Sequence, residues 1–515
     1  MPGIDLILKN ANVLTMDHRQ PAAGLVAITG DRVSLVAGNE MLESITGVKP
    51  RVINCRGKTV VPGFNDAHCH IFSFIKKLLS IDLSPASVCS IADIKAALHY
   101  RVRSTPLGQW LIGTDYNEFY LAEKRHPTRW DIDEVALHHP VVLAHRSLHA
   151  CVLNSRALSL AGITKGTPEP PGGLIDRDPI TGEPNGILFE MLGYIREKVL
   201  PPLSEEELID GVASANEHYL SYGITSLQDA TVVNDIGRWQ AFRKLKDTDK
   251  LKSRVSMMIG AKVQSQFQEA GLVTGSGNSQ LRLGGVKIIV NETTGQLYPP
   301  QSELNQQVFN AHQAGFQLAI HAIESTSVAA AITALECACS QLSQGERRHR
   351  IEHCSQCSIR LLNRLARLRA VVVTQPPFLY YSGERYLAEM SASQLRGLYR
   401  IKSLFDCGLV AAGSSDCPVV PDNPLIGIYA AVTRQAESGQ RILPQECISV
   451  GQALAMYTIN AAYASLEEGI KGSITQGKLA DLVVLSDDPI KSPPERMQDI
   501  KVEMTIIGGK VVWEA

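Results

Sequence analysis

Short apolar segments that end in polar residues recur along the middle of the chain, each followed by a stretch with helical spacing of apolar residues. Strands that alternate with helices are typical of parallel βαβ units. Eight such units suit a closed barrel, so the sequence predicts an α/β fold of the (β/α)8 TIM type. The predicted strands are residues 60–68, 223–229, 254–260, 285–291, 316–322, 349–354, 370–376 and 409–416.

Two further parts are expected outside the barrel. The first two strands are separated by residues 69–222, far more than a crossover helix needs, so we expect an inserted subdomain at about residues 73–220. Both chain ends are rich in strand-forming residues and turns. We therefore expect residues 1–61 and 463–515 to form one small β-sandwich domain, and residues 62–462 to form the barrel that carries the insert.

Composition argues against several classes of protein. The formal net charge is -2 and the pI is about 6.7, with no basic stripe, so a nucleic-acid partner is not expected. The apolar runs are too short to span a membrane, and the first residues do not resemble a signal peptide. Eleven irregularly spaced cysteines do not suggest a disulfide framework. We expect a cytoplasmic protein that acts on a small molecule, and leave a homodimer open.

Residues that commonly bind metal ions stand at the ends of the predicted strands. His68 and His70 are two positions apart, so a strand would place both imidazoles on one face. Because the chain has 14 histidines, one His-x-His pair alone is a weak signal. His321, His353 and Asp416 end three other predicted strands, and all strand ends of a parallel barrel open on the face that holds active sites. Their convergence predicts a metal site.

Lys287 lies within a β-branched apolar segment, where an ammonium group would be costly to bury. Three interpretations stay open. The lysine could extend to the surface, pair with a buried carboxylate, or be carbamylated and so become an anionic metal ligand.

Several segments resemble a known family. Residues 62–70, PGFNDAHCH, resemble the first-strand signature of the amidohydrolase superfamily, and residues 472–485, GSITQGKLADLVVL, resemble its C-terminal signature. Further segments are similar to the YtcJ-like branch, which includes N-substituted formamide deformylases. They are residues 140–143, 149–155, 186–190, 223–226, 350–353 and 374–377.

The resemblance implies a ligand set of one or two divalent metal ions, zinc being the expected one. His68 and His70 would bind the first ion, and His321 and His353 the second. A carbamylated Lys287 would bridge the two ions.

The resemblance also implies an activity. A metal-bound hydroxide would hydrolyse a carbon–nitrogen bond of a non-peptide amide or formamide. Asp416 would bind the first metal and carry the proton from the water to the departing nitrogen. His149 and Asn154, in the insert, are implied to contact the substrate.

Two positions depart from the branch pattern. Asn291-Glu292 stands where the branch usually has Asp-Gly, and Glu324-Ser325 stands where it usually has Gly-Asp. His321 and Glu324 together resemble the deaminase branch, in which one metal is bound and the glutamate shuttles protons. The alternative function is therefore a mononuclear deaminase of a cyclic amidine or an aminated heterocycle, with Glu324 catalytic. A non-catalytic relative is the third hypothesis, and a carbamate on Lys287 would favour two metals and amide hydrolysis.

Overall fold

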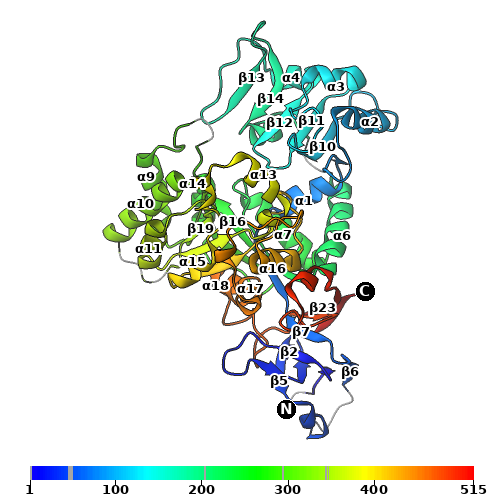
Figure 1. The fold of residues 1–515 in the computed structure, drawn as a ribbon, viewed down its shortest axis with the longest axis vertical. Helices are drawn as coiled ribbons and strands as arrows, with labels where there is room; N and C mark the ends of the chain where they lie inside the picture. The colour runs from blue at the N-terminus through cyan, green and yellow to red at the C-terminus, as the bar shows by residue number, and fades with distance from the viewer. Residues whose placement is uncertain (1–2, 45–49, 202–203, 293–294, 343–344, 346) are drawn as a thin grey trace. The chain divides into compact units, whose positions relative to one another are not determined.

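An eight-stranded parallel sheet carries the candidate site (Figure 1). The computed structural model describes residues 3–44, 50–201, 204–292, 295–342, 345 and 347–515. Each strand pairs in parallel with the next one along the chain. All eight predicted strands are present, although their bounds differ. They are β8 (Phe64–Cys69), β15 (Ile224–Asp229), β16 (Arg254–Gly260), β17 (Leu281–Ile289), β18 (Leu318–Ala322), β19 (Arg350–His353), β20 (Val371–Thr374) and β21 (Val410–Gly413).

The two edge strands of this sheet, β8 and β21, are connected by the residues that follow β21. The amide of Asp416 donates to the carbonyl of His68 at 2.8 Å, and the amide of His70 donates to the carbonyl of Cys417 at 2.8 Å. The sheet is thus a nearly closed barrel. These hydrogen bonds also fix the backbone of three candidate ligands at the point of closure.

The predicted first strand, residues 60–68, is two strands rather than one. β7 (Thr59–Pro62) belongs to a separate sheet, and β8 begins after Gly63. The amide of Gly63 donates to the carbonyl of Asp481, which borders the sheet that contains β7. The amide of Phe64 donates to the carbonyl of Gly223, which borders the barrel. A Cβ atom at Gly63 would lie 2.2 Å from Oγ1 of Thr225, so the chain crosses between the sheets at a position that favours glycine.

Helices follow the barrel strands, as βαβ units require. The helices of this part of the chain are α6 (Glu205–Ser221), α7 (Ile236–Asp247), α8 (Gln264–Glu269), α9 (Gln301–Gln313), α10 (Ser325–Gln341), α11 (Ile359–Arg367), α12 (Pro377–Tyr381), α13 (Gly383–Glu389), α14 (Ala392–Leu395), α15 (Ile401–Asp406), α16 (Pro424–Thr433), α17 (Val450–Met456) and α18 (Ile459–Ala464).

Strands from the two chain ends form two further sheets. One has the order β5-β4-β1-β6 and the other β24-β23-β22-β7-β2-β3, and both contribute to one hydrophobic core. N-terminal β7 pairs antiparallel with C-terminal β22, so the ends meet. The other strands are β1 (Leu6–Lys9), β2 (Asn12–Leu14), β3 (Ala22–Ala23), β4 (Leu25–Thr29), β5 (Arg32–Ala37), β6 (Arg51–Asn54), β22 (Leu482–Leu485), β23 (Val502–Ile507) and β24 (Lys510–Glu514).

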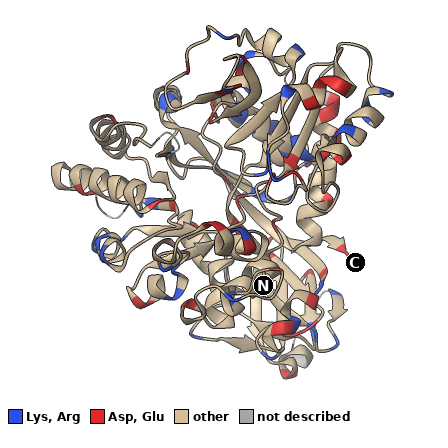
Figure 2. Cartoon of the chain, turned by 45° about the horizontal axis from the view of Figure 1, so that its top comes forward, with Lys and Arg blue, Asp and Glu red and all other residues tan. Residues whose placement is uncertain are grey.

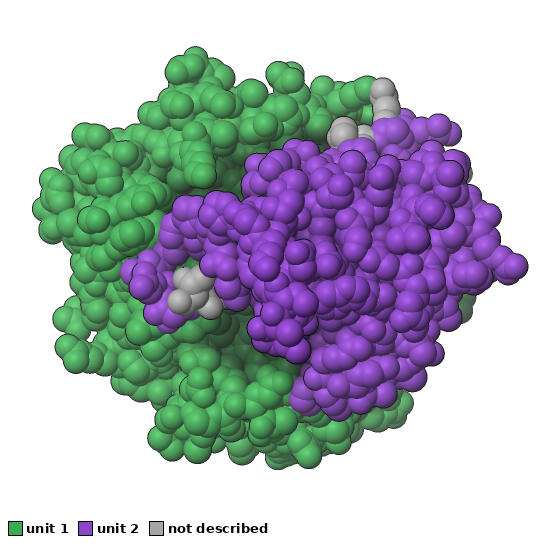
Figure 3. Space-filling model, turned by 90° about the horizontal axis from the view of Figure 1, so that it is seen from above, with its two compact units in different colours: residues 1–70, 215–291, 299–515 green, residues 71–214, 292–298 purple. Residues whose placement is uncertain are grey.

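The chain divides into two compact units, coloured separately in Figure 3. Residues 1–70, 215–291 and 299–515 form the first, which includes the barrel and both terminal sheets. The second contains residues 71–214, close to the predicted insert at 73–220, and also residues 292–298, which the sequence did not indicate.

The second unit has its own six-stranded sheet with the order β13-β14-β12-β11-β10-β9. Its strands are β9 (Ile81–Asp82), β10 (Leu111–Tyr116), β11 (Val141–His145), β12 (Ala150–Leu153), β13 (Leu174–Arg177) and β14 (Pro184–Phe189). Its helices are α1 (Ile71–Leu78), α2 (Ile91–Val102), α3 (Arg129–Ala136), α4 (Ser155–Ala161) and α5 (Leu192–Lys198).

Basic and acidic residues are interspersed along the ribbon in Figure 2. Within the described part of the chain, none of the helices has the length and apolar composition needed to cross a bilayer.

Candidate metal centre

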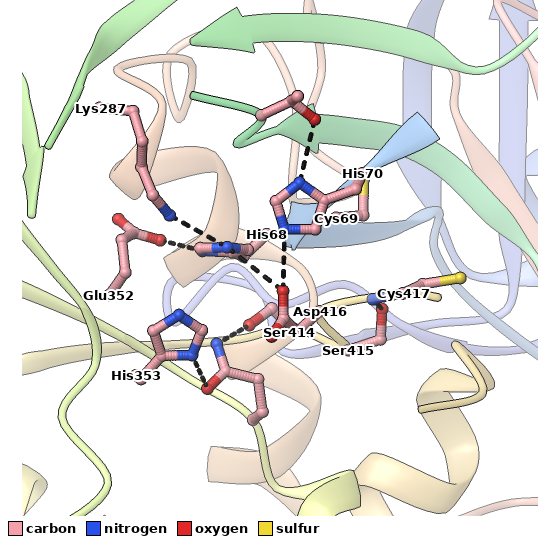
Figure 4. Close-up of polar contacts among 12 residues, drawn as sticks. His68, Cys69, His70, Lys287, Glu352, His353, Ser414, Ser415, Asp416 and Cys417 are labelled. Atoms are coloured by element: carbon pink, nitrogen blue, oxygen red, sulfur yellow. Dashed lines mark hydrogen bonds and ion pairs between the residues drawn. The ribbon is translucent and has the colours of Figure 1, made fainter. Parts of the chain in front are cut away.

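Four strand ends of the barrel bring the predicted ligands together, and Figure 4 shows four of these ligands, His68, His70, His353 and Asp416. His68 lies in β8, and His70 follows directly after it. His353 is the last residue of β19, and His321 lies near the end of β18. Asp416 lies three residues beyond the end of β21 rather than in the strand itself. The predicted convergence of these five residues is therefore present in the folded chain.

Two of these ligand positions have a left-handed backbone. The φ angle is 72° at His353 and 60° at Asp416. Non-glycine residues adopt this region at a cost and usually where the surroundings require it. Beside Asp416, the buried carboxylate of Asp66 accepts from the amide of His68 and from the amide and hydroxyl of Ser415. These bonds hold the segment that carries Asp416 against β8.

His68, His70 and Asp416 form the tightest group of possible ligands. One ligand atom from each residue lies within 4.8 Å of the others. Oδ1 of Asp416 lies 3.1 Å from Nε2 of His70 and 3.4 Å from Nε2 of His68. Two imidazole nitrogens and a carboxylate oxygen are a donor set that suits zinc and neighbouring divalent metals.

His321 and His353 lie next to this group. Their ring centroids are 4.3 Å apart, and that of His353 is 4.9 Å from that of His68. Nδ1 of His353 lies 2.9 Å from the amide oxygen of Gln375, which can only accept, so Nδ1 carries the proton. Nε2 then presents a lone pair, and this buried atom has no hydrogen-bond partner among the described residues. An unpartnered buried lone pair fits a metal ligand.

Lys287 also contacts His68. Its Nζ is 3.2 Å from Nε2 of His68, and the side chain is buried. Burial lowers the pKa of Lys287 to about 8, although the charges of Glu352 and Asp416 oppose this shift. The uncharged amine is therefore accessible near neutral pH.

Electrostatics keep the ligands in the protonation states that metal binding requires. Burial lowers the pKa of His353 to about 4 and that of His68 well below its ordinary value, so both imidazoles are neutral. Burial alone would raise the pKa of Asp416. The hydrogen bond with His70 and the neighbouring histidines outweigh burial and place this pKa below its usual range, so Asp416 is ionised.

Comparisons with known proteins identify the family. The family model described as "Amidohydrolase family" matches residues 51–513. This chain belongs to the amidohydrolase family. It is 28% identical to an N-substituted formamide deformylase of Arthrobacter pascens, over 99% of this chain and 98% of the relative. It is also 28% identical to the putative amidohydrolase YtcJ of Bacillus subtilis (strain 168), over 90% of each chain. The chain is thus a YtcJ-like amidohydrolase, a hydrolase of carbon–nitrogen bonds.

Solved structures share the fold of this amidohydrolase. An uncharacterized metal-dependent hydrolase from Pyrococcus horikoshii OT3 matches with a TM-score of 0.76 and 23% identity, covering 95% of this chain and 99% of that one. One from Pyrococcus furiosus matches with a TM-score of 0.73 and 25% identity, covering 94% and 100%.

Glu324, predicted as catalytic in the alternative function, stands at the start of α10. The hydroxyl of Ser327 donates to the main-chain carbonyl of Glu324 at 2.9 Å and lies 3.3 Å from one of its carboxylate oxygens. The carboxylate thus lies beside the first turn of its own helix.

The two predicted substrate-binding residues lie in the second unit of the amidohydrolase. His149 exposes 42% of its side chain, and its Nδ1 lies 2.8 Å from a carboxylate oxygen of Glu190; its predicted role stays a prediction. Asn154 is fully buried and caps α4. Its amide oxygen accepts from Val141 and Ala157, and its amide nitrogen donates to two backbone carbonyls. Asn154 therefore holds the backbone and has no polar group left for a substrate.

Sequence analysis did not single out the partners of the ligands. Glu352 contacts His68 from β19, and Arg350 of the same strand contacts Glu352. Gln375 contacts His353, and Thr231 lies 2.9 Å from Nδ1 of His70. In the sequence, residues 350–353 and 374–377 stand out only as family similarities. Strand alternation, which places Arg350 and Glu352 on one face, was the signal available.

A second group of ligand-type side chains, His312, Cys339 and His349, lines a cavity of about 330 Å³ together with four arginines. The amide of Leu318 donates to Nδ1 of His349, so Nε2 of His349 carries the proton and donates to Nδ1 of His312. Nε2 of His312 then donates to the carbonyl of Leu342. Every imidazole nitrogen is thus committed to a hydrogen bond, and this group does not fit a metal ion.

Proposed function

We propose that this amidohydrolase cleaves a non-peptide amide or formamide bond of a small molecule, using one or two divalent cations. The observation that supports the proposal best is the meeting of His68, His70 and Asp416 in one largely buried group, with His353 and its unpartnered nitrogen beside His68. Zinc is the cation that these nitrogen and oxygen donors favour.

Each side chain of the group would have a distinct role. A bound divalent cation would polarise the substrate carbonyl and lower the pKa of a water molecule. Ionised Asp416 would accept the proton of the attacking water and return it to the departing nitrogen. The neutral imidazoles of His68 and His353 would keep their Nε2 lone pairs for the cation. The uncharged amine of Lys287 would add to the carbon of carbon dioxide and lose one proton to water, forming a carbamate that adds a negative charge to the group.

Deamination is the other outcome that the sequence left open, and it requires Glu324 to reach the substrate. The contact of Glu324 with Ser327 at the start of α10 favours a role in the helix instead. This is why we propose amide hydrolysis rather than deamination.

Metal analysis combined with a substrate panel tests the proposal. Purified protein should contain one or two divalent ions per chain by elemental analysis. A chelator should abolish activity, and zinc, manganese or cobalt should restore it. Fully active protein without metal would contradict the proposal.

The panel should contain N-substituted formamides, simple amides and aminated heterocycles. Release of formate or another carboxylate together with an amine supports the proposal. Ammonia release from a heterocycle, combined with one bound metal and an inactive Glu324→Gln variant, would establish the deaminase instead.

A further inference from the structure

His68 is held by a buried carboxylate that is itself held by an arginine. Oε2 of Glu352 lies 2.5 Å from Nδ1 of His68. Nε and Nη2 of Arg350 donate to the two oxygens of Glu352 at 2.7 and 3.0 Å. Each of these three side chains is at least 98% buried. Arg350 also donates to the side chain of Gln228 and to the carbonyl of Ala67, so neither it nor Glu352 is free to rotate away.

This contact determines the tautomer of His68. A carboxylate can only accept, so Nδ1 of His68 carries the proton and Nε2 presents its lone pair. That lone pair faces Oδ1 of Asp416 at 3.4 Å and Nζ of Lys287 at 3.2 Å. The pair formed by Arg350 and Glu352 therefore aims the ligand nitrogen of His68 into the metal centre.

The histidine on the other side of the centre has a weaker partner. Nδ1 of His353 donates to the neutral amide of Gln375, which in turn donates to the hydroxyl of Ser414. A charged acceptor raises the basicity of an imidazole ligand more than a neutral one, because it stabilises the partial positive charge that the ring gains on binding a cation. The two sides of the centre are thus unequal before any ion binds.

We propose that Arg350 and Glu352 are positioning residues that make the side formed by His68, His70 and Asp416 the tighter divalent-cation site. The inference rests on the proposed metal-dependent function. When divalent cations are limiting, this site should fill first. When a chelator is added, it should empty last.

The test is a zinc titration of chelator-stripped protein against a chromophoric competitor. Glu352→Gln keeps an acceptor oxygen and nearly the same volume but removes the charge. It should weaken the tightest zinc-binding step by about 10–100-fold, the usual effect of removing a partner of a metal ligand. The visible absorption spectrum of cobalt-loaded protein should change in the same variant, because the ligand field of the tight site changes.

Gln375→Met is the matched control, since it removes the partner of His353 instead. It should leave the tightest step unchanged and weaken only a later one. Because Glu352→Gln leaves Arg350 buried beside a neutral group, an Arg350→Met/Glu352→Leu variant removes both charges and should show the same loss of affinity. Circular dichroism of each metal-free variant checks the fold.

Glu352→Gln protein that binds zinc as tightly as wild type would overturn the inference, as would Gln375→Met protein that loses the tightest step. Either result leaves the proposed function intact. Wild-type protein that binds no divalent cation would instead contradict the proposed function itself.

Discussion

Replacing Asp416 with asparagine removes one negative charge from the metal centre and leaves its shape nearly unchanged. The carboxylate lies 3.1 Å from Nε2 of His70 and 3.4 Å from Nε2 of His68. Its pKa is held below the usual range, so the group is ionised. An amide in the same place cannot accept and return a proton.

General acid–base catalysis contributes about 10²–10⁴-fold to rate, which corresponds to about 3–5 kcal/mol of activation free energy. We therefore expect kcat of Asp416→Asn to fall by about 10²–10⁴-fold with metal-saturated enzyme. Because His68 and His70 remain, metal occupancy should fall less than in His68→Ala. Steady-state kinetics with saturating zinc and elemental analysis of both variants provide the two measurements.

Asp422→Asn is a suitable control, because Asp422 is also a buried carboxylate close to Asp416 in the sequence. It pairs with His218 at 2.5 Å, a contact that asparagine can accept as well, so kcat should change little. Asp416→Asn protein with near wild-type kcat at full metal occupancy would refute the assignment. So would an equal loss of activity in Asp422→Asn.

Four further predictions concern other residues. Glu324→Gln should keep nearly all of its turnover, since its carboxylate contacts its own helix; an inactive variant would point to deamination. Asn154→Ala should lower the free energy of unfolding by about 2–4 kcal/mol, from a lost helix cap and orphaned backbone groups, with KM unchanged in the folded enzyme; unaltered stability in a denaturant titration would contradict this. Arg254→Met leaves Asp481, its buried partner at 2.6 Å, without a counter-charge. The free energy of unfolding should fall by about 3–5 kcal/mol in the same assay, and a loss no larger than that from breaking an exposed ion pair would argue against this. Because burial lowers the pKa of Lys287 to about 8, its uncharged fraction rises as pH increases toward 8. Labelling of Lys287 by ¹³C-bicarbonate, read by NMR, should therefore increase over that range, and no label at any pH would exclude a carbamate.

The barrel and its ligand residues could be predicted from the sequence because both signals are local. Each strand is an apolar segment followed by polar residues, and the parallel arrangement of eight such strands brings their ends to one face. His68, His70, His321 and His353 could be recognised for that reason, without knowledge of any contact between them. Asp416 could be recognised too, although it lies beyond the strand that it appeared to end.

The partners of these ligands depended on tertiary structure. Which acceptor faces each imidazole is set by strands that are distant in sequence. Glu352 reaches His68 across 284 positions and Gln375 reaches His353 across 22. These contacts choose the tautomer of each ring and hence the nitrogen that can bind a cation, a property that no local pattern encodes.

Burial likewise decided the role of residues that a family motif alone could not assign. The family resemblance implies a substrate contact for Asn154, but the fold commits both of its amide atoms to backbone groups. The break at Gly63 likewise depends on a residue distant in sequence, because Thr225 occupies the space that a side chain would need. Residue type and spacing determined which groups could take part in the chemistry. The packing of distant strands determined the direction in which each group points, because hydrogen bonding and steric exclusion act between neighbours in space rather than in sequence.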